Sequence, residues 1–403
     1  MLPRNYLWLF AAPNGQVFHA GPEANARYFS TNGTGSWGGT AFPHLNGETP
    51  GYGTAVLYGR GKILAVGGGR AAAEKIDLTV ASPAWSSAGT MSASRDNQSA
   101  TLLPDGAVLV TDGSSLNITD DYPAVLEAEL WTPPGLPLPS GTGTAGPTGH
   151  WTMLAPAQVP RLYHSTAVLL PDGRVLTTGG GQGGNYADHR DYEVFSPPYL
   201  FKGARPTISA APVAVKYGQN FTVTTPNTIQ KVRWIRLGSA THANDMNQRL
   251  NELTFTQSGS TLTITPPVVN DCPPGHYMLF VLDAAGVPSE AKIIAIDNTG
   301  CATPVNLTLT VSPQGSTTGC TTTRTFTATG NNLVTSSIRW SINGIHQPGG
   351  DGLTAISLTQ GLNYPYTWQH QVSVTALYQC GTYTGNATTT QQVISYFPNR
   401  QPE

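Results

Sequence analysis

The chain has 403 residues, including 45 glycines and 32 prolines, with 11% charged residues and a formal net charge of −2 at pH 7. Its length predicts two or three domains, and its charge provides neither a basic surface for nucleic acid nor a polybasic patch for a membrane surface. We therefore expect small uncharged partners, no nucleic acid, and no membrane insertion, since no apolar run reaches the roughly 18 residues of a spanning helix.

One sequence pattern occurs four times in the first half of the chain. It consists of an apolar strand, a tight turn with glycine, a second apolar strand and further glycine. The copies lie at residues 9–22, 55–69, 100–113 and 166–181. Their turn glycines are Gly15, Gly61, Gly106 and Gly173. A repeat of about 45 to 50 residues is typical of kelch-type β-propeller blades, small sheets whose inner strands line a central channel. We predict an all-β fold that begins with a partial propeller of about four blades, residues 1–205, with a Pro/Gly-rich insertion at 133–149.

Two smaller β-domains are expected after the repeats. A turn-rich passage that ends in Arg205 and Pro206 predicts a domain joint. The next strands are expected at 213–224, 230–238, 252–256, 260–265, 276–282 and 290–297, the spacing of an immunoglobulin-like sandwich at residues 206–300. Beyond residue 301 threonine, serine and asparagine alternate with apolar residues, which predicts an accessory immunoglobulin-like β-sandwich at 301–403.

All four cysteines, Cys272, Cys301, Cys320 and Cys380, lie in the last third of the chain without CxxC spacing. This pattern favours disulfides over a metal site, and with them an extracellular or cell-surface location. Counting outward from the DAAG turn brings Cys272 opposite Cys301, and Cys320 and Cys380 would pair across the last domain. The first residues contain no signal-like apolar core, so export has no direct support in this sequence.

Four segments carry a family resemblance: RLYHSTAVLLPDGRVLTTGGG (161–181), NYADHRDYEVFSPPYLFKGARPTI (185–208), THANDMNQR (241–249) and PGHYMLFVLDAAGVPS (274–289). They occur in the collinear order of the galactose oxidase and glyoxal oxidase family, copper radical oxidases, which the chain resembles over about residues 4–298. The resemblance implies a propeller of kelch type, an early-set immunoglobulin-like domain and one copper ion on the propeller axis. It also implies that Tyr163 and His164 match an axial tyrosine and a histidine ligand, and that His242 matches the second histidine.

Chemistry supports these residue types independently. Imidazole and phenolate suit Cu(II), and a phenolate can take the proton of a substrate hydroxyl, so Tyr163 is also the candidate catalytic residue. Neighbours on a regular strand point to opposite faces, so Tyr163 and His164 can share a metal only at a strand start or a bulge. Without the resemblance, such a pair is more often structural, and His242 fits an ordinary loop histidine equally well. The remaining candidates, His150 and His189, match no ligand and are expected at the surface or in turns.

The sequence also departs from the family. Its members oxidise primary alcohols or aldehydes with O2, giving H2O2, by one copper and a tyrosyl radical cross-linked to cysteine. No cysteine precedes Cys272, so the predicted propeller part cannot form that cross-link. Gln98 stands where members often have histidine, and RAAAEKID (70–77), interpreted as a loop, lacks the polar and aromatic pair associated with galactose.

Two hypotheses therefore remain open. In the first, the chain is the C-terminal fragment of a copper-dependent oxidase of a small alcohol, aldehyde or sugar, and missing N-terminal blades complete the propeller and supply the radical half. In the second, it is a non-catalytic secreted carbohydrate-binding or adhesion β-protein on the same scaffold.

Overall fold

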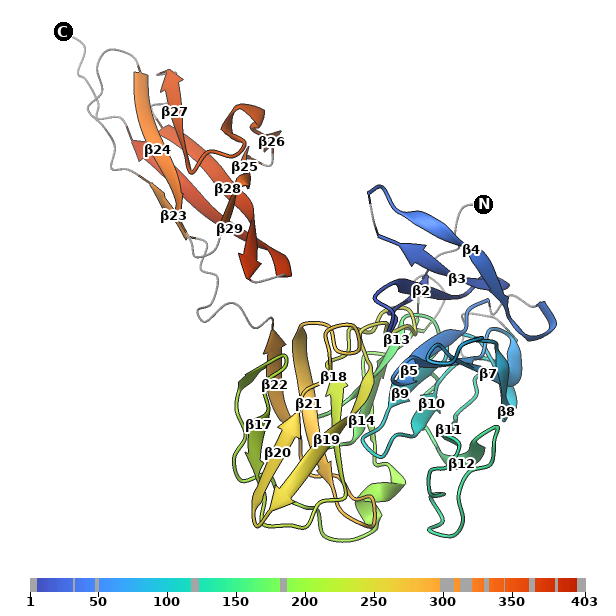
Figure 1. Cartoon of the computed structure of the whole chain (residues 1–403). Coiled ribbons are helices and arrows are strands. Elements are labelled where there is room, and N and C mark those ends of the chain that lie inside the picture. The colour runs from blue at the N-terminus through green and yellow to red at the C-terminus, as the bar shows by residue number, and fades with distance from the viewer. Residues whose placement is uncertain are drawn as a thin grey trace. The chain divides into compact units, whose positions relative to one another are not determined.

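The computed structural model describes residues 6–31, 33–47, 51–116, 123–181, 187–297, 308–311, 321–329, 333–343, 345–361, 367–380 and 383–396. Within them the protein is all-β, as predicted, and its helical segments are three short 3₁₀ turns, η1 (Leu45–Gly47), η2 (Pro198–Phe201) and η3 (Pro348–Gly350). No helix of the described chain has the length and apolar character needed to cross a bilayer. The chain forms two compact units, residues 1–297 and 298–403, visible in Figure 1.

The first fifteen strands form four antiparallel sheets, one for each sequence repeat. The first sheet contains β1 (Trp8–Ala11), β2 (Val17–Gly21), β3 (Asn25–Ser30) and β4 (Ser36–Pro43). The second contains β5 (Thr54–Gly59), β6 (Lys62–Val66), β7 (Arg70–Asp77) and β8 (Ser86–Arg95). The third contains β9 (Ser99–Leu102), β10 (Val108–Thr111), β11 (Glu127–Thr132) and β12 (His150–Pro156), and the fourth contains β13 (Ser165–Leu169), β14 (Val175–Gly179) and β15 (Tyr192–Phe195).

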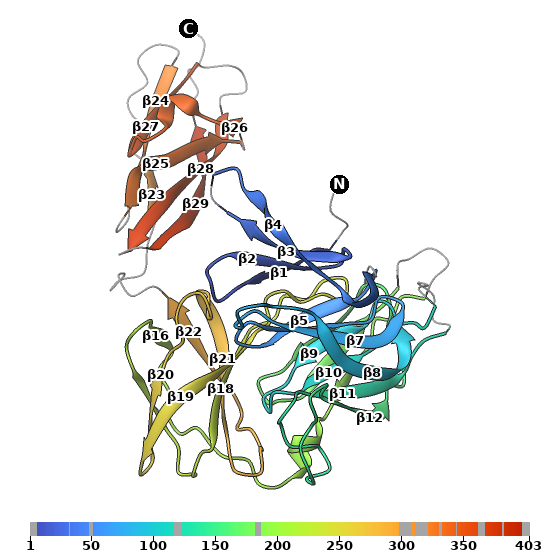
Figure 2. The same cartoon turned by 45° about the vertical axis from the view of Figure 1, so that its right-hand side comes forward.

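These sheets are arranged as the blades of a partial propeller. The first strands of consecutive sheets are neighbours, β1 beside β5, β5 beside β9 and β9 beside β13, and both cartoon views show the sheets following one another (Figures 1 and 2). The third sheet is covered on both faces: Val108 and Val110 belong to a core shared with the second sheet, whereas Leu109 belongs to one shared with the fourth. Alternating side chains point to opposite faces of a strand, so a strand covered on both faces is apolar throughout.

The turn glycines of the four hairpins have the backbone conformation that their turns require. Gly15, Gly61, Gly106 and Gly173 have φ angles of 83°, 63°, 92° and 81°, a region that glycine enters without the steric cost of a Cβ atom. The predicted insertion at 133–149 is the connection between β11 and β12. By contrast, residues 70–77, predicted to be a loop, form strand β7, so that prediction was wrong, because its residues pair with both β6 and β8.

The next seven strands form one sheet that folds over into a sandwich. Its strands are β16 (Ala214–Lys216), β17 (Phe221–Thr224), β18 (Lys231–Arg236), β19 (Leu250–Ser258), β20 (Thr261–Thr265), β21 (Gly275–Leu282) and β22 (Lys292–Asp297), in the order β16-β22-β21-β18-β19-β20-β17. The first half of β19 pairs with β18 and the second half with β20, so β19 connects the two layers. Apolar side chains of both layers, Trp234 and Leu262 among them, form the core between them.

The sandwich also packs against the blades within the first unit. Along β21, Leu279 and Val281 belong to the sandwich core, whereas Met278 and Phe280 belong to the cluster that contains Val56 and other blade residues. Complete burial of each such side chain contributes about 1.5–3 kcal/mol. The burial of both faces of β21 explains its uninterrupted apolar sequence.

The second unit contains two small sheets with a shared core, as predicted for an accessory sandwich. One sheet has the order β23 (Thr308–Val311), β24 (Thr321–Thr329), β27 (Ala355–Gly361), and the other β26 (Ile345–His346), β25 (Leu333–Ile342), β28 (Thr367–Cys380), β29 (Tyr383–Tyr396). Phe326 of the first sheet and Trp340 and Val374 of the second are fully buried together. We keep the domain boundaries 1–205, 206–300 and 301–403 as a proposal.

Candidate functional site

Tyr163 and His164 lie in a tight turn directly before β13. The Ser165 N–H donates to the carbonyl of Leu162 across the turn, at 3.0 Å, and His164 has a left-handed φ of 62°. This conformation breaks the strand alternation, and the two rings lie together with centroids 3.9 Å apart. The His164 Nδ1 donates to the carbonyl of Gly181 at 3.0 Å, because a carbonyl oxygen only accepts. Its Nε2 is therefore the nitrogen with a free lone pair.

His242 lies at the tip of the loop between β18 and β19. The loop reverses between Thr241 and Asn244, which exchange two backbone hydrogen bonds of 2.8 and 2.9 Å, and His242 and Ala243 both have left-handed φ, 51° and 63°. The Thr241 hydroxyl lies 2.8 Å from His242 Nδ1. When Nδ1 donates to this hydroxyl, Nε2 carries the free lone pair, as at His164.

Polar side chains of the same loop fix its shape and attach it to the blades. The carboxylate oxygen Oδ1 of Asp245 accepts from the backbone N–H groups of Ser239, Asn247 and Gln248. The Gln248 amide accepts from the Leu102 N–H at 2.8 Å and donates to the Ala100 carbonyl at 2.7 Å. Gln248 therefore hydrogen-bonds the third blade as a neighbouring strand would.

The three rings predicted as ligands converge from two parts of the fold. The His164 and His242 centroids are 4.8 Å apart, and those of Tyr163 and His242 are 5.6 Å apart. Partial burial, and then the nearby His164, lower the pKa of His242, which favours the neutral imidazole that a metal requires. Within the described residues, no group of three or more His, Cys, Asp or Glu could hold a metal ion, so a metal here would need phenol oxygen as well as imidazole nitrogen.

A cavity of about 380 Å³ lies against these rings, bounded by Tyr163, His242 and Asn244. The sequence analysis missed one of its residues, Tyr6, whose ring stacks on His242 at a centroid distance of 4.4 Å and an interplanar angle of 22°. The Tyr6 and Tyr163 hydroxyl oxygens are 3.3 Å apart. This hydrogen bond, together with burial, raises the pKa of Tyr6 to about 12.

The repeat contains a signal that would have found Tyr6. In each copy, the residue nine positions before the turn glycine belongs to the cavity or to the ring cluster: Tyr6, Tyr52, Asn97 and His164. Three of them, Tyr6, Asn97 and His164, have nearly equal φ angles of 61°, 58° and 62°. The fold therefore presents one side chain of each blade to the same place, with the same left-handed φ in three of the four blades.

Backbone strain is concentrated at this site. Seven described non-glycine residues have a left-handed φ, and five of them lie at or beside the cavity: Tyr6, Asn97, His164, His242 and Ala243. Such conformations are uncommon for side-chain-bearing residues and gather at functional sites, where the surrounding structure maintains them. Their concentration here supports a functional site independently of the residue types.

The other predicted residues do not line this cavity. His150 is exposed at the start of β12, and His189 is partly exposed in the connection before β15. Gln98 is fully buried and donates to the Val66 carbonyl at 3.0 Å, so the cavity-lining residue of this repeat is its neighbour Asn97.

The cysteine pairings stay predictions. Cys272 is a buried free thiol in the described part of the chain, and burial raises its pKa to about 11. Its predicted partner Cys301, like Cys320, lies outside the described residues, as does the side chain of Cys380.

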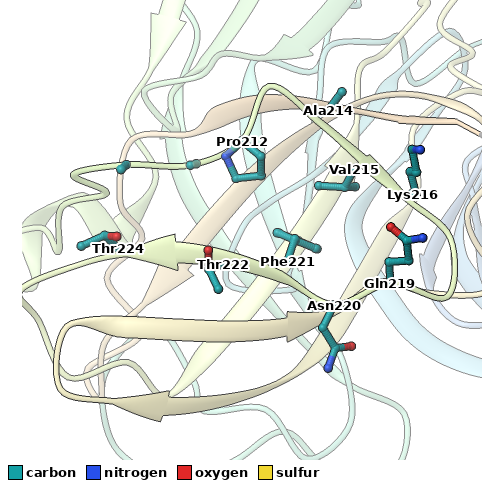
Figure 3. A pocket seen from close by; sticks show the side chains of 11 residues that line it. Pro212, Ala214, Val215, Lys216, Gln219, Asn220, Phe221, Thr222 and Thr224 are labelled. Carbon is teal, nitrogen blue, oxygen red and sulfur yellow. The ribbon is translucent and has the colours of Figure 1, made fainter. Parts of the chain in front are cut away.

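A larger cavity, of about 520 Å³, lies on the sandwich between residues 210–216 and β17. Figure 3 shows Val215 and Phe221 pointing toward each other across it, with Lys216 and Gln219 at one end. Its lining includes one charged side chain and no histidine, cysteine or tyrosine.

Comparison with known proteins supports the resemblance predicted from the sequence. The model of the glyoxal oxidase N-terminus matches residues 58–199, and that of the galactose oxidase-like early set domain matches residues 205–296. A galactose oxidase of Gibberella zeae is 33% identical over 319 residues, which cover 72% of this chain and 45% of that protein. An aldehyde oxidase of Arabidopsis thaliana is 31% identical over 249 residues, 55% of this chain and 39% of that protein. Over these residues the chain resembles the galactose oxidase and glyoxal oxidase family.

A solved structure agrees with this resemblance. A fungal alcohol oxidase of the AA5 family, in complex with copper, matches with a TM-score of 0.63 and 29% identity over 72% of this chain and 63% of that chain. The resemblance to the galactose oxidase and glyoxal oxidase family, and the expected propeller with a following sandwich, are thus confirmed. The chain spans less than half the length of the two curated relatives it matches.

Proposed function

We propose that this chain is part of a copper-dependent oxidase that converts a primary alcohol to an aldehyde with O2, giving H2O2, or oxidises an aldehyde in the same way. The observation that supports this most is the convergence of His164, His242 and Tyr163 beside a cavity, in a chain that resembles this family. We further propose an extracellular or cell-surface location, which the four cysteines favour.

The residues present fit a copper ion. Imidazole nitrogen and phenol oxygen suit Cu(II) in tetragonal geometry, and both histidines have Nδ1 hydrogen-bonded so that Nε2 remains for a metal. In this proposal His164, His242 and Tyr163 would hold the copper ion. Copper, when bound, supplies an electron acceptor and a Lewis acid for the substrate oxygen.

Tyr163 has the second role of proton acceptor. Its phenol oxygen borders the cavity, where it would take the hydroxyl proton of a bound alcohol as a general base. Aromatic side chains of Trp8 and Tyr52 on the same cavity provide apolar surface for the rest of a small alcohol, aldehyde or sugar.

The reaction removes two electrons and two protons from the alcohol, and O2 takes up both pairs to become H2O2. A single bound copper would supply an acceptor for one electron only, so a second acceptor is needed, which in the family is the Tyr–Cys radical. No cysteine precedes Cys272, and we propose that this second acceptor comes from protein outside these 403 residues.

This proposal predicts substrate binding without turnover. In the copper-loaded chain, a primary alcohol or aldehyde is expected to shift the visible absorption of Cu(II), while H2O2 production stays at the level of free copper. Turnover by the chain alone would contradict the external second acceptor. No spectral shift with any alcohol, aldehyde or sugar would contradict a substrate site at the metal.

A further inference from the structure

Tyr6 connects three separate parts of the fold at the candidate site. It precedes β1 of the first blade, its ring stacks on His242 of the sandwich loop, and its hydroxyl is hydrogen-bonded to that of Tyr163, which precedes the fourth blade. One side chain therefore contacts two of the three residues proposed to hold copper.

We propose that Tyr6 is a positioning residue of this site, which fixes the ring plane of His242 by stacking and the hydroxyl of Tyr163 by its hydrogen bond. The inference rests on the proposed copper site and adds to it a residue that sets metal affinity without binding the metal. Partners that orient metal ligands in this way typically contribute roughly 10- to 100-fold in metal affinity.

His242 needs such a partner because of its position. Its side chain is only partly buried and its backbone φ is left-handed, so neither a surrounding core nor a regular strand fixes its ring. The Thr241 hydroxyl holds one ring atom, Nδ1. A second contact, on the ring face, is required to fix the ring plane, and Tyr6 provides it.

The stacked geometry also distinguishes a positioning residue from a fourth ligand. A metal bound to an imidazole nitrogen lies in the plane of the ring, whereas Tyr6 lies over the face of His242 with only 22° between the planes. Its hydroxyl reaches the Tyr163 oxygen from outside the His242 plane. The effect of Tyr6 is therefore expected on the strength of copper binding, with the set of coordinating atoms unchanged.

Two substitutions separate the ring from the hydroxyl. Tyr6→Leu removes both contacts and is expected to raise the Kd for Cu(II) at least about tenfold. Tyr6→Phe keeps the stacked ring and loses one hydrogen bond, which corresponds to about two- to tenfold. Tyr192→Leu, at a tyrosine that is 69% exposed on β15, is the matched control and should leave the Kd unchanged.

The metal-free protein gives an independent readout. The His242 Hε1 signal, assigned with His242→Ala, carries the ring-current shift of a stacked aromatic ring, so it should move in Tyr6→Leu and stay within the wild-type range in Tyr6→Phe. The EPR spectrum of the Cu(II) form should keep the same nitrogen couplings in Tyr6→Phe.

Three results would overturn the inference: an unmoved His242 signal in Tyr6→Leu, an unchanged Kd in both variants, or an EPR spectrum in Tyr6→Phe that shows a lost oxygen ligand. If the wild-type chain binds no copper, the proposed metal site fails, and the His242 signal alone decides whether Tyr6 fixes the ring.

Discussion

Replacing Gln248 by alanine should loosen the loop that carries His242. Its amide satisfies the N–H of Leu102 and the carbonyl of Ala100, and both hydrogen bonds are buried. Each buried backbone group left without a partner costs about 1–3 kcal/mol, so Gln248→Ala should lower the free energy of unfolding by about 2–6 kcal/mol. Because the same bonds attach the loop to the third blade, the Kd for Cu(II) should rise roughly tenfold or more.

The assay is urea denaturation of the whole chain followed by tryptophan fluorescence, with copper affinity measured by isothermal titration calorimetry. Gln257→Ala is the matched control, because the Gln257 amide also bonds backbone groups, the Ile229 N–H and the carbonyls of Asn227 and Gly259. Gln257 is only partly buried and lies on β19 of the sandwich. Gln257→Ala should therefore lower the free energy of unfolding by less than Gln248→Ala does, and it should leave copper affinity unchanged. Equal effects of the two variants on copper affinity would refute the anchoring role of Gln248.

Two further predictions concern buried carboxylates. Burial raises the pKa of Asp96 from 3.8 to about 6, so its contribution to the free energy of unfolding is complete below pH 3.8 and is lost as the pH rises through 6. Asp96→Asn should therefore be about 2 kcal/mol more stable than wild type at pH 8. If denaturation curves show no larger stability difference between variant and wild type at pH 8 than at pH 4, this prediction is wrong. Glu74 is buried, lies within ion-pair distance of His44 and Arg70, and accepts from the Leu45 N–H, so Glu74→Ala should cost about 3–5 kcal/mol at pH 7. Its partners hold its pKa below 4.5, so this difference should shrink as pH falls below 4.5, and a difference constant down to pH 3 would contradict the ion pairs.

Much of the fold could be predicted from the sequence because the hairpins are specified locally. Gly61 and its equivalents mark a tight turn between two apolar strands, and each pair formed. The outer strands were harder to predict from the sequence. Strand β4, with two glycines and mostly exposed side chains, has no alternating pattern. Strand β7 forms because β6 and β8 pair with it on both sides.

The site was predictable only in part. Tyr163, His164 and His242 followed from the family motifs and from the rule on strand starts, but Tyr6 lies outside any motif. Its place at the site depends on the nine-residue offset from the turn glycine and on a contact between residues more than 230 positions apart. The turns of the repeat reveal neither feature by themselves.

The most direct test of the proposed site is EPR of the Cu(II)-loaded chain, comparing wild type with His242→Ala and with His150→Ala, which removes an exposed histidine remote from the rings. We expect one copper per chain with a tetragonal, nitrogen-coupled spectrum that loses a nitrogen coupling in His242→Ala and is unchanged in His150→Ala. No stoichiometric copper in the wild type, or the same spectrum in His242→Ala, would contradict the account.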